Sequence, residues 1–290
     1  MPDKPQPAAS IIAFQGAPGA YSHLACREMF PQLEALPTPS FEDAFAAVEE
    51  GRAELAMIPI ENSQAGRVAD IHFLLPESKL HIIAEHFHRV QHCLLAVPGA
   101  DIRDIRAALS HPQALGQTRS YLRSKGIAAR AHQDTADAAR AVAELGDKSL
   151  AAIASRLAAE IYRLAILDED IEDATHNTTR FVVLAREPRQ PEAEAGPIMT
   201  SLFFAVRNVP AALYKALGGF ATNGVNITKL ESYLRDGQFV AAEFYADIEG
   251  HPQDPHVALA LEELRFHTRW VRVLGSYTIR RDRHTGAMRE

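Results

Sequence analysis

The segment from Asn177 to Phe181 concentrates side chains that can take part in chemistry. It places an amide, two hydroxyls and a guanidinium directly before the apolar run 181–185. One interpretation is a loop that turns the chain and leaves Arg180 on the surface. The other is a set of neutral hydrogen-bond donors with one cation, which would suit an anionic substrate.

A second candidate segment, Gly16 to Ser22, joins a predicted strand at 11–14 to a predicted helix at 22–30. Its glycines would let the backbone approach a ligand, and the N-terminus of the helix offers unpaired N–H groups to an anion. The spacing matches neither a P-loop nor a dinucleotide-binding fingerprint. A tight strand-to-helix turn explains the same residues without any ligand.

Three further polar segments lie at predicted strand-to-helix junctions, where α/β sheets bind ligands. The same residue types also build turns and helix N-caps. A lone histidine in such a segment could act as an acid or base, although capping or core positions are its commoner use. The segments are Glu61-Asn62-Ser63, Ser110-His111-Pro112-Gln113 and Asp134-Thr135.

A pair of histidines, His86 and His88, lies in an extended stretch predicted at 80–97. Residues two apart on a strand share a face, so a metal pair is conceivable. No third ligand of suitable spacing stands nearby in the sequence, and a solvated strand face explains the pair more simply. The sequence therefore predicts no metal site.

Apolar strands alternate with amphipathic helices from residue 11 to residue 185, which is typical of an α/β fold with a largely parallel sheet. Pro59 indicates a strand end or a sheet edge. The predicted strands are 11–14, 55–60, 128–132, 151–154 and 181–185, and the predicted helices are 22–30, 41–50, 68–75, 113–124, 135–145 and 156–164.

The pattern changes after a linker at 186–198, which is rich in proline and charge. A strand at 201–207 precedes a helix at 210–222, and a hairpin at 227–248 is centred on Asp236-Gly237. A helix at 255–266 and a strand at 270–277 complete a β-α-β-β-α-β order. That order predicts a ferredoxin-like unit with two helices on one face of an antiparallel sheet.

Composition disfavours several classes of protein. The net charge is -7, which disfavours a nucleic-acid or anionic-membrane surface because either would need clustered positive charge. The two cysteines, Cys26 and Cys93, form no CxxC pair, so we expect reduced thiols and a cytoplasmic protein. Residues 1–10 lack the pattern of a signal peptide, and no apolar run is long enough to span a bilayer.

Taken together and in order, these segments resemble the signatures of the prephenate dehydratases. The matching residues are Gly16 to Ser22, Glu61 to Ser63, Ser110 to Gln113, and Thr179-Arg180-Phe181. The resemblance implies a two-lobed catalytic domain like the type II periplasmic binding proteins, at 11–185. Lobe 1 would comprise about 11–81 and 166–185, and lobe 2 about 82–165.

The same resemblance implies the site residues. The catalytic residues would be Thr179, Arg180 and Phe181, and no cofactor would be needed. The substrate-binding residues would be Asn62, Ser63, Ser110, His111, Gln113, Thr135 and Asn177.

Residues 199–278 resemble an ACT domain, the phenylalanine sensor of this family, and 279–290 would be a tail. Ala211-Ala212-Leu213-Tyr214 matches one signature, and Glu231-Ser232 matches half of the other, although its Arg-Pro pair is replaced by Tyr233-Leu234. The resemblance implies a homodimer or homotetramer. The candidate phenylalanine contacts are Asn208, Ala211, Ala212, Leu213, Asn223, Asn226, Ile227, Glu231 and Ser232.

The implied reaction converts prephenate to phenylpyruvate. Thr179 would donate a hydrogen bond to the departing hydroxyl. A cation against the ring carboxylate would favour the ground state, so Arg180 would serve the side-chain carboxylate or support the loop. Two alternatives are a dehydratase for arogenate, the aminated analogue, and a non-catalytic binding protein of the same fold.

Overall fold

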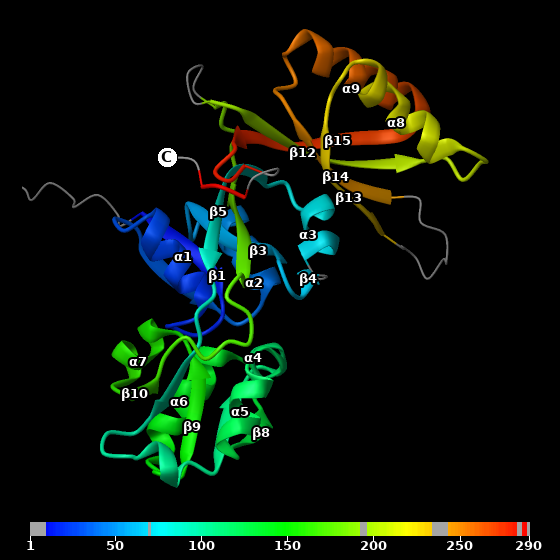
Figure 1. The fold of residues 1–290 in the computed structure, drawn as a ribbon. Coiled ribbons are helices and arrows are strands. Elements are labelled where there is room, and N and C mark those ends of the chain that lie inside the picture. Colours follow the sequence, from blue (N-terminus) through cyan, green and yellow to red (C-terminus); the bar gives the residue numbers. More distant parts are fainter. Residues whose placement is uncertain (1–9, 69–70, 192–195, 234–242, 283–285, 289–290) are drawn as a thin grey trace, which may run out of the picture. The chain divides into compact units, whose positions relative to one another are not determined.

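The computed structural model of the chain describes residues 10–68, 71–191, 196–233, 243–282 and 286–288 (Figure 1). The chain divides into two compact units, each built from two segments. One contains residues 1–68 and 87–181, and the other contains residues 69–86 and 182–290. Within the described segments, no helix has an apolar run long enough to cross a membrane.

The first sheet has the strand order β2-β1-β3-β11-β5, and β4 pairs with β3. Strand β1 pairs in parallel with both β2 and β3, and its centre (Ile12, Ala13 and Phe14) is fully buried. The elements of this part are β1 (Ile11–Gln15), α1 (Tyr21–Met29), β2 (Glu34–Thr38), α2 (Phe41–Glu49), β3 (Leu55–Asn62), β4 (Gly66–Arg67), α3 (Ile71–Glu77), β5 (His81–Arg89) and β11 (Thr178–Ala185).

The second sheet has the order β10-β6-β9-β7-β8. Strand β7 is parallel to β8 and β9, whereas β6 is antiparallel to β9 and β10. Its elements are β6 (Cys93–Ala96), the 3-10 turn η1 (Ile102–Asp104), β7 (Ala107–Ser110), α4 (Pro112–Gln117), α5 (Arg119–Lys125), β8 (Ala128–Ala131), α6 (Thr135–Leu145), β9 (Leu150–Ala154), α7 (Arg156–Tyr162) and β10 (Ala165–Asp168).

Local capping explains where several of these helices start and end. Ser40, Asp134 and Ser155 each accept a hydrogen bond from a backbone N–H in the first turn of the helix that follows, which satisfies donors that have no partner inside the helix. Gly126 and Gly146 close α5 and α6 in the left-handed conformation that glycine adopts easily.

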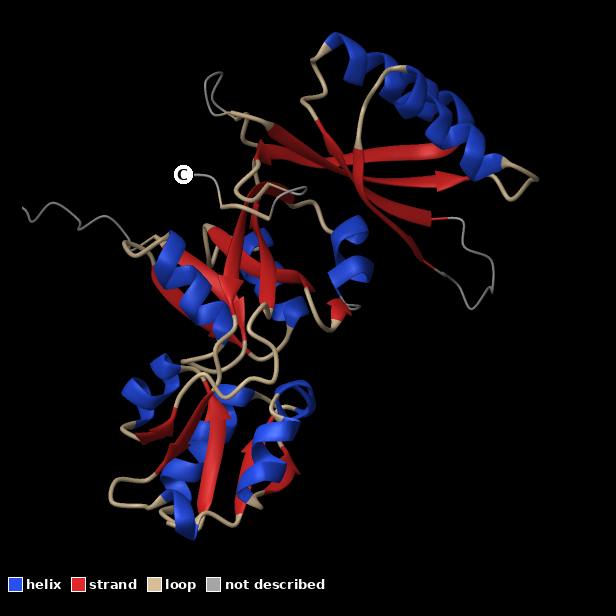
Figure 2. Cartoon of the chain, in the orientation of Figure 1, coloured by secondary structure: helices blue, strands red, loops and turns tan. Residues whose placement is uncertain are grey.

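The C-terminal sheet is antiparallel throughout, with the order β13-β14-β12-β15. Figure 2 shows both of its helices on one face. Alternate residues of β12, among them Leu202 and Phe204, pack beneath those helices. The elements are β12 (Ile198–Val206), α8 (Ala212–Thr222), β13 (Ile227–Tyr233), β14 (Glu243–Glu249), α9 (Pro255–His267) and β15 (Thr268–Thr278). They follow the predicted β-α-β-β-α-β order, and the predicted Asp236-Gly237 turn lies outside the described residues.

The extended stretch predicted at 80–97 is in fact two strands in different sheets. Strand β5 belongs to the first sheet and β6 to the second, and the chain crosses between the sheets at 90–92. It crosses back at 169–177, after β10. The lobe limits predicted at 82 and 165 do not coincide with these changes of sheet, because β5 lies in the first sheet and β10 in the second.

Three other expectations about elements are wrong. Both sheets of this part are mixed rather than largely parallel, since β4, β6 and β10 pair in antiparallel fashion. Pro59 lies inside β3, an interior strand, because the pairing of β1 with β3 ends at Met57 and does not need the missing N–H. The predicted helix 113–124 is broken at Thr118, whose hydroxyl donates to Ala114 O at 2.9 Å.

Candidate active site

Hydrogen bonds connect the end of β3 to the start of β11. The backbone N–H of Ser63 donates to Thr178 O at 2.9 Å. The Ser63 hydroxyl accepts from the backbone N–H of Thr178 at 3.0 Å and donates to His176 O at 2.9 Å. Two segments that the sequence singled out separately therefore form one rigid junction.

The side chain of Thr179 lies at this junction and is held by an amide. Asn62 Nδ2 donates to Thr179 Oγ1 at 3.0 Å and to Asn177 Oδ1 at 2.8 Å. A hydroxyl that accepts a hydrogen bond still has its own proton to donate. The arrangement thus presents Thr179 as a positioned neutral donor.

Arg180 and Phe181 point into the protein interior. The Arg180 side chain is 2% exposed, and its Nη1 donates to Glu61 Oε1 at 3.1 Å. Phe181 is 1% exposed and belongs to the core. The interpretation that left Arg180 on the surface is wrong, because its charge is neutralised by a carboxylate at the end of β3. A fully buried phenyl ring gives Phe181 a packing role.

The glycine-rich segment packs against the second sheet's helices. A Cβ on Gly19 would lie 2.8 Å from Ala158 Cα of α7, and Gly19 has φ +95°. Its carbonyl accepts from the Ser155 hydroxyl at 2.6 Å, and its N–H donates to His23 Nδ1 at 3.0 Å. These contacts favour the turn interpretation, since close packing alone requires glycine there.

The candidates of the second sheet lie at the carboxyl edge of its parallel strands. Ser110 is fully buried, and its hydroxyl donates to Ile153 O at 2.6 Å. His111 caps α4, with Nδ1 accepting from Gln113 N at 3.2 Å. Thr135 opens α6 directly after its cap Asp134. Ser110 therefore has a structural bond, while His111 and Gln113 stay exposed at the edge.

A buried polar chain between the two sheets was not predicted. The Tyr21 hydroxyl lies 2.7 Å from His92 Nδ1, and His92 Nε2 lies 3.0 Å from Gln117 Oε1. The backbone N–H of His92 donates to Glu172 Oε2 at 3.0 Å. Burial lowers the pKa of His92, even though Gln117 and Glu172 raise it. The available signal was a histidine directly before the apolar run that starts at Cys93.

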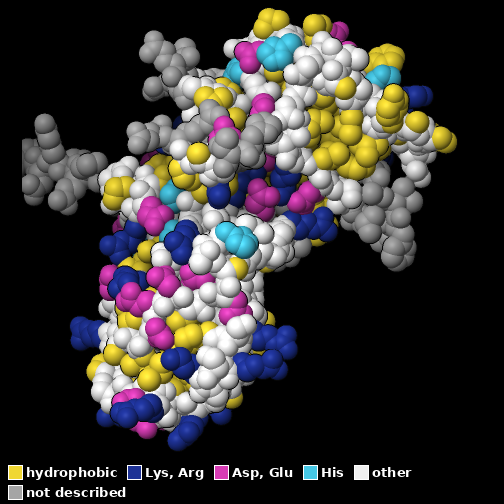
Figure 3. Space-filling model, viewed as in Figure 1, with side chains coloured by type: hydrophobic (Ala, Val, Ile, Leu, Met, Phe, Trp, Pro, Cys, Tyr) yellow, Lys and Arg dark blue, Asp and Glu magenta, His cyan; other side chains and the backbone are white. Residues whose placement is uncertain are grey.

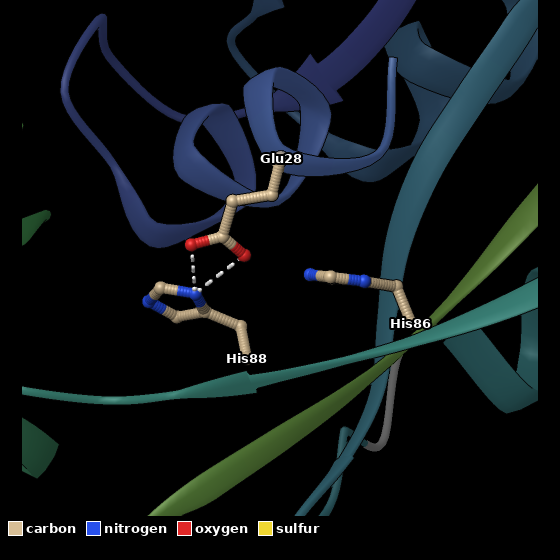
Figure 4. Close-up of side chains that lie close together, drawn as sticks. All are labelled: Glu28, His86 and His88. Atoms are coloured by element: carbon tan, nitrogen blue, oxygen red, sulfur yellow. Dashed lines mark hydrogen bonds and ion pairs between the residues drawn. The ribbon is translucent and has the colours of Figure 1, made fainter. Parts of the chain in front are cut away.

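Figure 4 shows the Glu28 carboxylate of α1 directed at His88 of β5, with His86 on the same strand. Both Glu28 oxygens lie within hydrogen-bond distance of His88 Nδ1, at 3.0 and 3.1 Å. Each of the three side chains could offer a ligand atom to a metal. A carboxylate from α1, far away in the sequence, thus joins the strand face that was expected to be solvated. A hydrogen bond accounts for the geometry of Glu28 and His88.

Most residues predicted to contact phenylalanine lie near one end or the other of α8, and Glu231 and Ser232 lie on β13. This helix has 11 residues, so its ends are about 16 Å apart. Ala211 begins it in a left-handed conformation with φ +61°, while Asn223 Nδ2 bonds to Gly219 O at its end. Glu231 lies on β13, where it pairs with Lys229. One small ligand cannot reach both ends of α8 in a single chain.

Two mixed sheets joined by two crossing segments place this part of the chain in the α/β class, with a hydroxyl held at the junction of β3 and β11. A sequence model of the prephenate dehydratase family matches residues 12–189. The chain belongs to the prephenate dehydratase family.

Its relatives include a bifunctional N-acyl-homoserine lactone acylase/prephenate dehydratase of Komagataeibacter europaeus, which is 52% identical over 92% of this chain and 95% of the relative. The chain is also 42% identical to arogenate dehydratase/prephenate dehydratase 1 of Arabidopsis thaliana, over 92% of this chain and 71% of the relative. A solved prephenate dehydratase from Arthrobacter aurescens in complex with L-Phe has a TM-score of 0.84 and is 29% identical. The match covers 93% of this chain and 90% of the solved chain.

The buried state of His92 predicts a pH-dependent stability. Its pKa is lowered in the folded protein, so acidification protonates the unfolded chain first. The contribution of neutral His92 to the free energy of unfolding is complete above the ordinary histidine pKa near 6.5. It is lost as the pH falls below that value, by at most about 1.4 kcal/mol per pH unit. We expect the free energy of unfolding of His92→Gln to fall less between pH 7.5 and pH 5 than that of the wild type. Chemical denaturation at several pH values measures this, and parallel curves would contradict it.

Proposed function

We propose that this chain is a prephenate dehydratase that converts prephenate to phenylpyruvate for phenylalanine biosynthesis. The observation that carries the proposal is the Thr179 hydroxyl, which is held by Asn62 at the junction of β3 and β11. Membership of the family supports a carbon–oxygen lyase. The two-lobed type II periplasmic-binding-protein architecture is proposed with it, since each of the two sheets would form the core of one lobe.

In the proposed reaction, the bond from the ring carbon to its carboxylate breaks and carbon dioxide leaves. The electron pair of that bond enters the ring, and the opposite carbon releases its hydroxyl, which leaves as water once protonated. Electrons balance without an oxidant or reductant. Thr179 stabilises the charge that develops on the departing oxygen by donating a hydrogen bond.

The burial of Arg180 supports one of its two expected roles. The ring carboxylate loses its charge during the reaction, so a cation beside it would stabilise the substrate more than the transition state. Arg180 is 2% exposed and paired with Glu61. It therefore supports the junction, and Phe181 does the same by packing, while Thr179 alone of the three meets the substrate. Ser63, His111, Gln113 and Thr135 remain the proposed orienting groups.

The C-terminal sheet with α8 and α9 is proposed to be an ACT domain that binds phenylalanine between two copies of the chain. The separation of the candidate contacts at the two ends of α8 supports an inter-chain site. Figure 3 shows hydrophobic side chains gathered on this part of the surface. On the two helices, Tyr214, Leu259 and Phe266 are exposed. The solved Arthrobacter aurescens relative contains L-Phe. A homodimer or homotetramer follows from this proposal.

Thr179→Ala tests the catalytic proposal. We expect turnover of prephenate to fall at least about 100-fold, because a single donor to a developing charge contributes on that scale. The product, phenylpyruvate, is followed by its absorbance, and thermal unfolding confirms that the variant is folded. Near-wild-type turnover by folded Thr179→Ala would falsify the role. The same assay with arogenate decides between the two substrates.

Phenylalanine is expected to raise the midpoint of thermal unfolding and to lower turnover, because a ligand of the folded state stabilises that state and inhibition requires unequal binding to two conformations. The control is D-phenylalanine, which has the same composition and hydrophobicity. If both enantiomers leave the midpoint and the rate unchanged, the domain does not sense phenylalanine.

A second candidate activity is hydrolysis of the amide bond of N-acyl-homoserine lactones, and it rests on the relative at 52% identity whose name includes that acylase. We expect purified enzyme to release homoserine lactone and a fatty acid, detected by mass spectrometry. If Thr179→Ala keeps this activity while losing turnover of prephenate, the two reactions use different groups. Absence of released fatty acid would remove this candidate.

A further inference from the structure

The amide of Asn62 has all of its hydrogen-bonding capacity engaged within the protein. Its Nδ2 group donates to Asn177 Oδ1 at 2.8 Å and to Thr179 Oγ1 at 3.0 Å. Its Oδ1 accepts from the backbone N–H groups of Gln64 and Ala65, each at 3.0 Å. Two amide protons and two lone pairs are therefore used. Asn62 is also 8% exposed. Its side chain therefore has no polar atom left for the direct contact with substrate that the resemblance implies.

These bonds determine the direction of the Thr179 hydroxyl. A threonine side chain can occupy several staggered rotamers. The N–H from Asn62 selects the rotamer that brings Oγ1 toward it and occupies one of the two lone pairs of Oγ1. The hydroxyl proton must then point elsewhere, because the amide nitrogen offers only donors.

Asn177 determines which way the Asn62 amide faces. Its Oδ1 accepts from Asn62, and its own backbone carbonyl accepts from Val90 N at 2.9 Å. Asn177 is fully buried, and within the described part of the chain its Nδ2 has no hydrogen-bond partner. A flipped Asn177 amide would place two donors against each other, so the observed orientation is enforced despite the unsatisfied N–H.

Asn177 also connects the site to both crossing segments. It ends the segment 169–177, and Val90 begins the segment 90–92 that leads from the first sheet to the second. The order of contacts is Val90 N to Asn177 O, Asn177 Oδ1 to Asn62 Nδ2, and Asn62 Nδ2 to Thr179 Oγ1.

We propose that Asn62 and Asn177 are positioning residues that direct the Thr179 hydroxyl toward the departing oxygen, and that neither binds the substrate itself. This rests on the proposed role of Thr179. The amide pair is also bonded to Val90, where the chain starts to pass between the two sheets, so the donor is fixed on the ends of β3 and β11. Preorganised donors of this kind act without reorganising during the reaction.

Asn62→Asp is the first test, because it keeps the shape of the side chain and replaces the N–H donor with an acceptor. We expect kcat for prephenate to fall at least about 30-fold with KM within threefold of the wild type, because substrate contacts are untouched. Gln32→Glu is the control, since it makes the same amide-to-carboxylate change on an exposed side chain that takes no part in the junction. It should stay within threefold of the wild type in both constants.

A double-mutant cycle separates positioning from a structural effect. If Asn62 acts through Thr179, Asn62→Asp should cost nothing further in the Thr179→Ala background, measured at enzyme concentrations that give detectable turnover. Additive losses, or a KM that rises more than kcat falls, would overturn the proposal. Asn177→Leu repeats the cycle from the other end of the amide pair, with the same lack of additivity expected, and thermal unfolding checks every variant.

Failure of this inference is distinguishable from failure of the proposed function. A wild-type enzyme without turnover of prephenate, or a Thr179→Ala variant with full activity, contradicts the proposed function itself. An active wild type, an impaired Thr179→Ala and an additive cycle contradict only the positioning role of the two asparagines.

Discussion

The hydrogen-bonded junction between the end of β3 and the start of β11 is the constraint on which the site depends. Asn62 and Thr179 are 117 positions apart in the chain, and between them the chain builds the whole second sheet. Only when β11 returns to the first sheet do Glu61, Asn62 and Ser63 meet their bonding partners at 176–180. The site is therefore completed by the same pairing that closes the sheet, which couples its geometry to folding of the entire segment 11–185.

Charge is distributed at this junction in a way that suits the proposed chemistry. The guanidinium of Arg180 is removed from solvent and neutralised by Glu61. The groups left beside Thr179 are neutral amides and hydroxyls. For a substrate that loses a carboxylate as carbon dioxide, neutral donors avoid stabilising the starting charge. A buried ion pair contributes little net stability by itself, so its value here lies in fixing the strand ends that carry the donors.

Local patterns predicted the structure well where local physics decides it. The start of α6 after Asp134 and the β-α-β-β-α-β order of the C-terminal part follow from capping and from the period of apolar residues. The prediction of a single extended stretch at 80–97 failed because one apolar pattern runs through two strands. Only the pairing partners show that β5 and β6 lie in different sheets. Strands β2 and β10 were missed because each is short and partly polar, so neither has a clear hydrophobic period.

The sequence by itself determined the family, since several short motifs in a set order are far more specific than any one of them. The resemblance carried by those motifs also singled out Thr179 as the residue for the proposed chemistry. The tertiary structure decided the roles of its neighbours. Asn62 proved to hold Thr179, Arg180 proved to be buried, and Ser110 proved to bond to a strand. These roles depend on hydrogen-bond partners far away along the chain, and no local pattern encodes which distant donor meets which acceptor.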